Sequence, residues 1–435
     1  MHFFSSKFCN WPPFRLIFSK FKVYGLALTL IIVWWAIAFS PKSYLSQTID
    51  ISLEKLISTS IEDQNIVAHI NVDRSSLKQA LGGDFALMTR LIADWDIDAQ
   101  LLEAKGFSDI QRLPHRDFLR TQLLGRAITN PNKNELIRLK SESVIPAVTD
   151  DLSNKINLKD KYRRFLPQTY SSASFLLALV PPSQIVALPS RLREKTELYP
   201  KALTDLIRLD IDRYNAEKLF EERPEIAFVA HYSHPSTLQA LRSQGIQLYM
   251  MKELNTLEAI NQELMNIGRL VDRPIEAELM QFFLSAASIA LDNKLTLMNN
   301  HLFKMHKPLP TVLYVNYHHN FSIPTAKTLT GHFLRKIATW DISLKYGEDH
   351  GLHELWTIPI DKEHIVNLNP DCLIIVAEHP KALEEQMLHD AALQQIKAVK
   401  NHQLYFVNEC IQQSPCQYII LAYCDLIDAL ASIKK

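Results

Sequence analysis

The pattern of apolar and polar positions divides the chain into three parts. Residues 23–39, VYGLALTLIIVWWAIAF, contain no charged side chain. Residues 41–60 are polar and mixed, as in a stalk, and from about residue 61 to 160 the spacing is mostly helical, clearest over 87–107 and 116–128, where apolar side chains recur every three to four positions. From about residue 161, short apolar runs alternate with helical segments, and this alternation predicts parallel β-sheets flanked by helices.

The uncharged run at the N-terminus is typical of a membrane segment. It is about 17 residues long, at the short end of what spans a hydrocarbon core. Basic side chains concentrate before it, at Lys7, Arg15, Lys20 and Lys22. The positive-inside rule then places residues 1–22 in the cytoplasm and everything after residue 42 outside it. Ala36-Ile37-Ala38 also fits a cleavage site, so a removable signal peptide is the alternative, although the length of the run favours an uncleaved anchor over 23–40.

A long helix is predicted in the middle of the β/α region. Residues 275–303 contain neither proline nor glycine, and a helix of that length would extend roughly 40 Å, enough to connect two lobes. The pattern predicts an α/β protein with a parallel-sheet lobe on each side of this helix. The expected order is a stalk and mainly helical region of unknown role, a first lobe, a linking helix and a second lobe, over residues 41–160, 161–272, 273–303 and 304–435.

Composition narrows the possible functions. The chain is 47% hydrophobic and 22% charged with zero formal net charge, so no nucleic-acid partner is expected. Glycine occurs only ten times, and no glycine-rich phosphate loop is present. No HExxH motif and no pair of catalytic carboxylates is found, so the chain is not expected to be an enzyme. Cys410 and Cys416 are close enough in sequence to form a small disulfide-closed loop, with two thiols as the alternative.

Several blocks of the β/α region share a recognisable order. They are Arg164–Leu179, DRYNAEKLFEERPEIAFVA (212–230), LRSQGIQLYMM (241–251), IPIDKEHIVNLNPDCLIIV (358–376) and IKAVKNHQLYFVN (396–408). With the long helix between them, residues ~161–435 resemble the periplasmic substrate-binding proteins of ABC importers for iron–siderophore, haem and cobalamin. The resemblance does not cover residues 41–160.

The resemblance implies a function in uptake. A protein of this type binds an iron chelate, haem or corrinoid without holding a permanent cofactor, and delivers it to an ABC permease with its ATPase. Glu217 and Glu363 occupy matching positions in the two lobes, where such proteins pair glutamates with permease arginines; the alternative is two ordinary glutamates at helix starts. The N-terminal helix would hold the protein at the inner membrane with its lobes in the periplasm. The alternatives are a membrane-anchored interaction or sensing protein built on the same module and, less favoured, a metal-dependent hydrolase.

The ligand is expected in the cleft between the lobes, at the carboxyl ends of the strands. The loops expected there are rich in tyrosine, histidine and basic residues: Tyr170, Arg191, His231, Tyr232, His234, Lys252, Tyr317, His318 and His319. Phenolate and imidazole groups ligate ferric iron or haem, and basic groups neutralise an anionic chelate. Alternatively the histidines, with Glu378, could hold Zn²⁺ or Mn²⁺. Ordinary amphipathic loop residues are the remaining interpretation.

Overall fold

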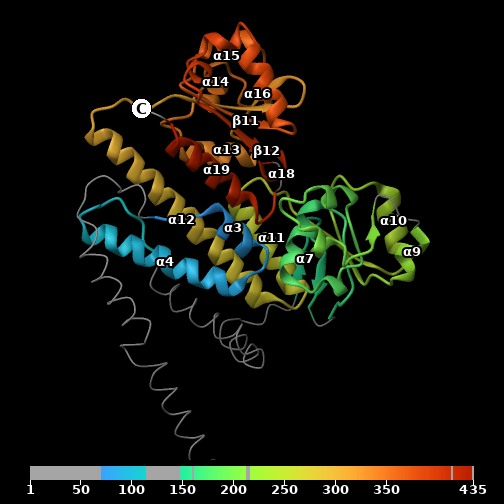
Figure 1. Cartoon of the computed structure of the whole chain (residues 1–435). Helices are drawn as coiled ribbons and strands as arrows, with labels where there is room; N and C mark the ends of the chain where they lie inside the picture. The colour runs from blue at the N-terminus through green and yellow to red at the C-terminus, as the bar shows by residue number, and fades with distance from the viewer. Residues whose placement is uncertain (1–69, 114–146, 159–160, 212–215, 413–414, 434–435) are drawn as a thin grey trace, which may run out of the picture. The chain divides into compact units, whose positions relative to one another are not determined.

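The first lobe is built on a three-stranded parallel sheet. The computed structural model (Figure 1) describes residues 70–113, 147–158, 161–211, 216–412 and 415–433. The order of strands in this sheet is β3 (Phe165–Pro167), β6 (Ile226–Val229) and β7 (Gln247–Met250). All four residues of β6 are buried, as expected for a continuous apolar run covered on both faces. A short parallel pair, β4 (Ala187–Leu188) and β5 (Leu209–Asp210), lies beside it. The helices of this lobe are α7 (Tyr170–Leu179), α8 (Lys201–Thr204), α9 (Ala216–Glu221) and α10 (Pro235–Ser243).

The second lobe contains a five-stranded mixed sheet. Its parallel part is β8 (Val312–Tyr317), β11 (Cys372–Ala377) and β12 (Leu404–Asn408), and its antiparallel edge is β9 (Phe321–Pro324) and β10 (Thr357–Ile360), in the order β10-β9-β8-β11-β12. The predicted α/β class with parallel sheets is confirmed, but this sheet is not parallel throughout. Residues 318–320 form a tight turn that reverses the chain from β8 into β9, where the sequence pattern predicted only a loop.

Helices surround this second sheet. They are α13 (Leu329–Lys336), α14 (Ser343–Asp349), α15 (Lys362–Leu368), α16 (Pro380–His389), α17 (Lys397–Lys400), α18 (Glu409–Gln412) and α19 (Ile419–Ala431). Buried side chains of the sheet, among them Val315, Ile323 and Ile375, form a second hydrophobic cluster with Leu383 and Met387 of α16.

The predicted long helix is present as α12 (Pro274–Lys304), 31 residues long. It packs against α11 (Leu257–Leu270), which follows the first sheet, and against α19, which follows the second. Gly268 permits the close approach to α11, because a Cβ at that position would lie 2.2 Å from the Cβ of Ala277. That α12 is the single rigid link between the lobes stays a prediction.

Two helices from the region before residue 161 pack against the long helix α12 and the C-terminal helix α19. Asp73 caps α3 (Arg74–Leu81) and Asp84 caps α4 (Phe85–Ala104), so the predicted helix over 87–107 is confirmed. α4 packs along α12 and α3 packs on α19 (Figure 1), and we call these four helices the helical core. Trp95 of α4 stacks on Phe283 of α12 with ring centroids 5.5 Å apart. The described part of the mainly helical region is therefore continuous with the hydrophobic core of the lobes.

A hairpin connects this region to the first sheet. Its strands are β1 (Ala147–Thr149) and β2 (Lys155–Asn157), which pair antiparallel. The backbone N–H of Asp151 donates to the carbonyl of Met250 over 3.0 Å, and the Asp150 carboxylate accepts from the backbone N–H of Met250 over 3.3 Å. The hairpin is thereby fixed to the end of β7.

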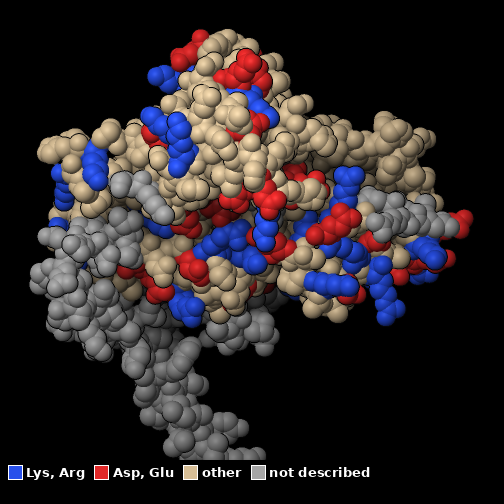
Figure 2. Space-filling model, turned by 45° about the horizontal axis from the view of Figure 1, so that its top comes forward, with Lys and Arg blue, Asp and Glu red and all other residues tan. Residues whose placement is uncertain are grey.

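The predicted membrane segment, the stalk and the helix expected over 116–128 lie outside the described residues. Within the part of the chain that the structure does describe, no helix combines the length and apolarity needed to cross a membrane. On the face shown in Figure 2, acidic and basic side chains are interspersed rather than gathered into a patch of one sign.

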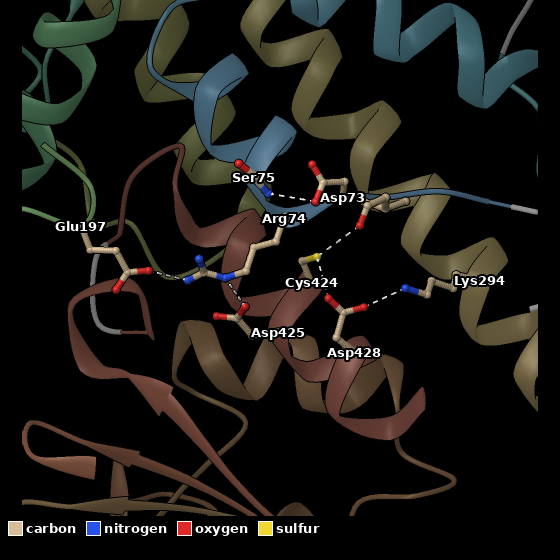
Figure 3. A network of polar contacts seen from close by, with 9 residues as sticks. Asp73, Arg74, Ser75, Glu197, Lys294, Cys424, Asp425 and Asp428 are labelled. Atoms are coloured by element: carbon tan, nitrogen blue, oxygen red, sulfur yellow. Dashed lines mark hydrogen bonds and ion pairs between the residues drawn. The ribbon is translucent and has the colours of Figure 1, made fainter. Parts of the chain in front are cut away.

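A polar network connects the first lobe, α3 and α19 (Figure 3). Arg74 donates from Nε to Oδ1 of Asp425 over 2.5 Å and from Nη2 to Oε1 of Glu197 over 2.7 Å. Nearby, Lys294 of α12 pairs with Asp428 of α19 over 2.7 Å. One guanidinium thus joins a first-lobe loop to the C-terminal helix.

Candidate functional site

The candidate site is a pocket of about 390 Å³ lined by residues of both lobes, which we call the interlobe pocket. From the first lobe it receives the segments that follow the strands: Thr169 and Ser171 after β3, Ala230–Tyr232 after β6, and Met251–Asn255 after β7. This is the carboxyl edge of a parallel sheet, where ligand sites are expected. The wall from the second half of the chain comprises Asn316, Pro324, Thr328–Thr330, Trp356, Thr357, Gln412 and Pro415.

The first-lobe wall is rigid at the start of α7. Thr169 caps this helix through its hydroxyl, which accepts from the backbone N–H of Ser172 over 3.1 Å, and the Ser172 hydroxyl completes a capping box. The Thr169 hydroxyl also lies 3.5 Å from the sulfur of Met251. Both Thr169 and Ser172 are buried, so the loop after β3 is held in one conformation.

Two large aromatic side chains stand exposed at the pocket, one on each side. Tyr232 is 73% exposed on the first-lobe side and Trp356 is 53% exposed on the second-lobe side. The Tyr232 ring meets that of His231 edge-on, with centroids 5.2 Å apart. Each of these side chains offers a flat apolar face with a polar atom, which suits contact with a planar or aromatic ligand.

Gln412 of α18 lines the pocket from the second lobe and is hydrogen-bonded to a buried tyrosine behind it. The phenol of Tyr314, in β8, donates to Oε1 of Gln412 over 2.7 Å. Burial raises the pKa of Tyr314, so the phenol stays protonated and acts as the donor. The amide oxygen of Gln412 is thereby occupied, and its Nε2 has no hydrogen-bond partner among the described residues.

Three of the predicted binding residues line the interlobe pocket: His231, Tyr232 and Lys252. The others from the first lobe lie elsewhere. Tyr170 is half-buried in the first turn of α7, with the Lys195 ammonium 4.8 Å from its ring centroid. His234 caps α10 by accepting from the backbone N–H of Ser236, and Arg191 is exposed in the short 3₁₀-helix Ser190–Glu194.

The residues predicted to face the cleft from the second lobe lie mainly on another surface. Successive side chains of a strand point to opposite faces, so Asn316 lines the interlobe pocket whereas Tyr317 does not. Tyr317 and His319 line a second pocket of about 590 Å³, formed by second-lobe residues alone. His318 lies in the turn between β8 and β9, with Nδ1 3.8 Å from a carboxylate oxygen of Glu409. We expected a loop after β8, so the reversal of the chain from β8 into β9 was not predicted.

The alternative metal site is not assembled. His231 and His234 belong to the first lobe, and the turn with His318 and His319 belongs to the second. Within the described ranges, no group of three or more histidine, cysteine or acidic side chains is placed to hold a metal ion. Cys410 and Cys416, the pair that might have closed a loop, are thiols in the structure.

Several pocket residues were not predicted from the sequence, among them Trp356, Thr330 and Gln412. Trp356 is exposed and directly precedes β10. It could have been predicted as a binding residue, because aromatic residues are enriched at contact surfaces. Thr330 and Gln412 belong to α13 and α18, whose positions at the pocket follow from tertiary packing.

Comparison with known proteins identifies the architecture. Residues 169–409 match the profile of the family described as periplasmic binding protein, which is more than half of the chain. The chain belongs to the periplasmic binding protein family. No curated protein matches it. Members of this family are solute-binding proteins of ABC transporters, which bind ligands such as haem or iron chelates instead of carrying permanent cofactors.

Two solved structures are similar in fold. One is described as a possible iron-binding (periplasmic solute-binding) protein from Staphylococcus epidermidis; it is 20% identical with a TM-score of 0.50, and the match covers 62% of this chain and 99% of that one. The other is a periplasmic binding protein from Veillonella parvula, 17% identical with a TM-score of 0.51, covering 66% and 98% of the two chains. The family match starts at residue 169, which follows α3 and α4 in the present chain.

Proposed function

We propose that this binding protein takes up an iron-bearing chelate, haem or a corrinoid in the interlobe pocket and delivers it to an ABC importer. The observation that carries this proposal is the pair of exposed aromatic side chains, Tyr232 and Trp356, on opposite sides of one pocket. Planar or aromatic-bearing chelates stack on such faces. The Staphylococcus epidermidis protein, described as possibly iron-binding, supports the same class of ligand.

The test is direct binding to the full-length protein. Haemin, cobalamin and ferric siderophores should be titrated against it by isothermal titration calorimetry, a readout that does not depend on Trp356 at the pocket. We expect saturable binding of at least one probe and its loss in the Tyr232→Ala/Trp356→Ala double variant. A matched control is Tyr317→Ala, which removes an aromatic side chain from the second-lobe pocket instead. Unchanged affinity in the double variant would contradict the proposal.

Delivery to the permease is proposed to use Glu217 and Glu363. Each lies exposed in the first turn of a short helix, α9 or α15, one in each lobe. Paired acidic side chains on two lobes would fix the orientation of docking onto arginines of a permease. Glu217→Lys and Glu363→Lys together should abolish uptake by cells while leaving ligand affinity of the purified protein unchanged. Normal uptake by the double variant would exclude this docking mode.

Residues 23–40 are proposed to anchor the protein in the inner membrane, with the lobes in the periplasm. The supporting observation is the uncharged run preceded by basic residues. A reporter enzyme that works only outside the cytoplasm should be active when fused after residue 60. A cytoplasmic location of that fusion would exclude uptake from the periplasm.

A further inference from the structure

A buried carboxyl group supports the segment that forms a large part of the first-lobe wall of the interlobe pocket. That segment, Met251–Asn255, lies between β7 and α11 and lines the pocket along its whole length. Glu263 lies in the second turn of α11 and is 0% exposed, and the phenol of Tyr249 in β7 donates to its Oε2 over 3.0 Å. The backbone N–H of Lys252 also stabilises its ionised form. Glu263 thus contacts both the strand before this segment and the segment itself.

Burial is the main influence on this carboxyl group. Its Oε1 has no hydrogen-bond partner among the residues that the structure describes. Burial raises the pKa of Glu263 to about 7, although hydrogen bonds from Tyr249, Asn266 and the backbone of Lys252 favour the ionised form. Water would stabilise a carboxylate here, and water can reach it only if part of the surrounding chain opens. Met251–Asn255 has no regular secondary structure, so this segment can open at the least cost.

The other charged groups near α11 are spread over several elements. They are Asp150 directly after β1, Lys252, Glu276 and Glu278 of α12 and His332 of α13, while α11 itself adds Glu258 and Arg269. Lys252 favours the ionised form of Glu263, and Asp150 acts on the phenol of Tyr249. Burial lowers the pKa of His332, so His332 loses its proton at a lower pH than Glu263 does. The helix α7, which also packs on α11, contains no acidic or basic residue.

We propose that Glu263 is a proton-controlled latch for the first-lobe wall: its neutral carboxyl group keeps Met251–Asn255 closed over α11, and its ionisation opens that segment. This regulates the pocket and rests on the proposed function. Once the opened segment gives the carboxyl group its ordinary pKa, opening is favoured about tenfold more at pH 8 than at pH 6. Ligands that contact the segment should therefore be held more tightly at acidic than at alkaline pH.

The test measures backbone hydrogen exchange of the full-length protein at pH 6 and pH 8, corrected for the intrinsic effect of pH on exchange. We expect the amides of residues 251–255 to be about tenfold less protected at pH 8. Glu263→Gln replaces the acid by a neutral group of the same shape and should keep the segment equally protected at both pH values. Glu258→Gln, at the exposed start of the same helix, is the matched control and should retain the wild-type response.

The amides of β11 distinguish local opening from global unfolding. Because β11 is buried throughout, its amides report global unfolding and should exchange more slowly than those of the segment. Exchange of both at the same rate would overturn the latch.

A second variant tests the latch without altering the carboxyl group. Tyr249→Phe removes a hydrogen bond that favours the ionised form, so the loss of protection should extend to higher pH. A merely structural contact would instead weaken the segment equally at every pH, which would overturn the proposal. This variant decides the matter if Glu263→Gln fails to fold.

Ferrichrome and cyanocobalamin, titrated at pH 6 and pH 8, connect the latch to the pocket. A probe that binds should bind the wild type more tightly at pH 6 and should bind Glu263→Gln equally at both. Equal affinity of the wild type at both pH values overturns the control of binding by Glu263. A segment whose exchange responds to pH in the same way in the wild type and Glu263→Gln overturns the latch but leaves the uptake function in place. The expected exchange pattern without binding of these probes or haemin overturns the uptake function alone.

Discussion

The helical core and the interlobe pocket are formed by the same two halves of the chain, yet they are built in opposite ways. In the helical core, large side chains such as Phe283 and Tyr423 are fully buried, and the ring of Tyr423 stacks on that of Phe333 with centroids 5.0 Å apart. In the pocket, Tyr232 and Trp356 stand in solvent, and Nε2 of Gln412 has no acceptor among the residues that the structure describes. The difference teaches that stability and recognition are separated in this protein, and each can be perturbed alone.

The largest effect is expected from Phe283→Ala in the helical core. Phe283 is completely buried and stacks on Trp95, so the substitution leaves a cavity between α4 and α12. The free energy of unfolding should fall by about 3–5 kcal/mol. Urea denaturation measures this, with Tyr232→Ala as the exposed control, for which a change below about 0.5 kcal/mol is expected. An equally large loss in Tyr232→Ala would remove the distinction between the two regions.

Arg74→Ala should have the next largest effect on the free energy of unfolding, and this effect should depend on pH. It removes both ion pairs of the guanidinium, which is about one-third exposed, so a loss of about 1–2 kcal/mol is expected at pH 7. Burial already raises the pKa of Asp425 to about 6, and Arg74 opposes this rise. Without Arg74 the pKa of Asp425 should increase further.

The sign of the pH dependence follows from that raised pKa. Between about pH 4 and 6 the folded protein binds more protons at Asp425 than the unfolded chain does, so this carboxylate reduces stability as pH rises through that range. In the Arg74→Ala variant, stability should continue to decline as the pH rises above 6. The stabilities of the variant and the wild type should therefore be most similar at about pH 4.5. Urea denaturation at several pH values tests this, and Asp425→Asn should remove the extra decline. If Arg74→Ala lowers the free energy of unfolding equally at pH 4.5 and pH 7, Asp425 is excluded as the cause of the loss.

Single substitutions at the pocket should alter binding and not folding. Trp356→Ala should weaken ligand binding about tenfold, or about 1.4 kcal/mol, with little change in Tm. Leu355→Ala is a matched control, because Leu355 is similarly exposed beside Trp356 but does not line the pocket. Equal effects of the two substitutions would point to a disturbed strand end rather than a lost contact.

The smallest expected change is in shape. Since the helical core packs both halves of the chain against α12, binding should close the pocket only slightly. Small-angle scattering of the protein with and without ligand should give the same radius of gyration within error. A clear compaction on binding would show that the core does not hold the lobes.

The sequence predicted long or fully buried elements well and short ones poorly. The uninterrupted helical spacing over 275–303 and the apolar run 226–229 correspond to α12 and β6. β9 was not predicted because Phe321–Pro324 is short and ends in a proline. Proline argues against a strand unless that strand is known to lie at the edge of a sheet. Tyr317 was expected to face the cleft, whereas the structure places it at the end of β8, where it lines the second-lobe pocket.

The candidate site was only partly predictable. His231, Tyr232 and Lys252 follow strands of a parallel sheet, so their place at its carboxyl edge could be foreseen. Gln412 could not, since its place at the pocket follows from the packing of α18, and its hydrogen-bond partner Tyr314 lies 98 positions earlier in the chain. The packing of α3 and α4 on the lobes was equally hidden, because contacts between distant amphipathic helices leave no local signal.

The four described cysteines offer a practical means of observing the pocket. Burial raises the pKa of Cys372 to about 12, and it also raises the pKa of the fully buried Cys416 and Cys424, so these three thiols should resist alkylation. Burial raises the pKa of Cys410 as well, but this thiol is only half-buried in α18, two residues from Gln412, so its greater exposure favours labelling there. In a Cys9→Ser background, an environment-sensitive fluorophore should therefore attach selectively beside the pocket and convert the protein into an optical sensor of its own ligand.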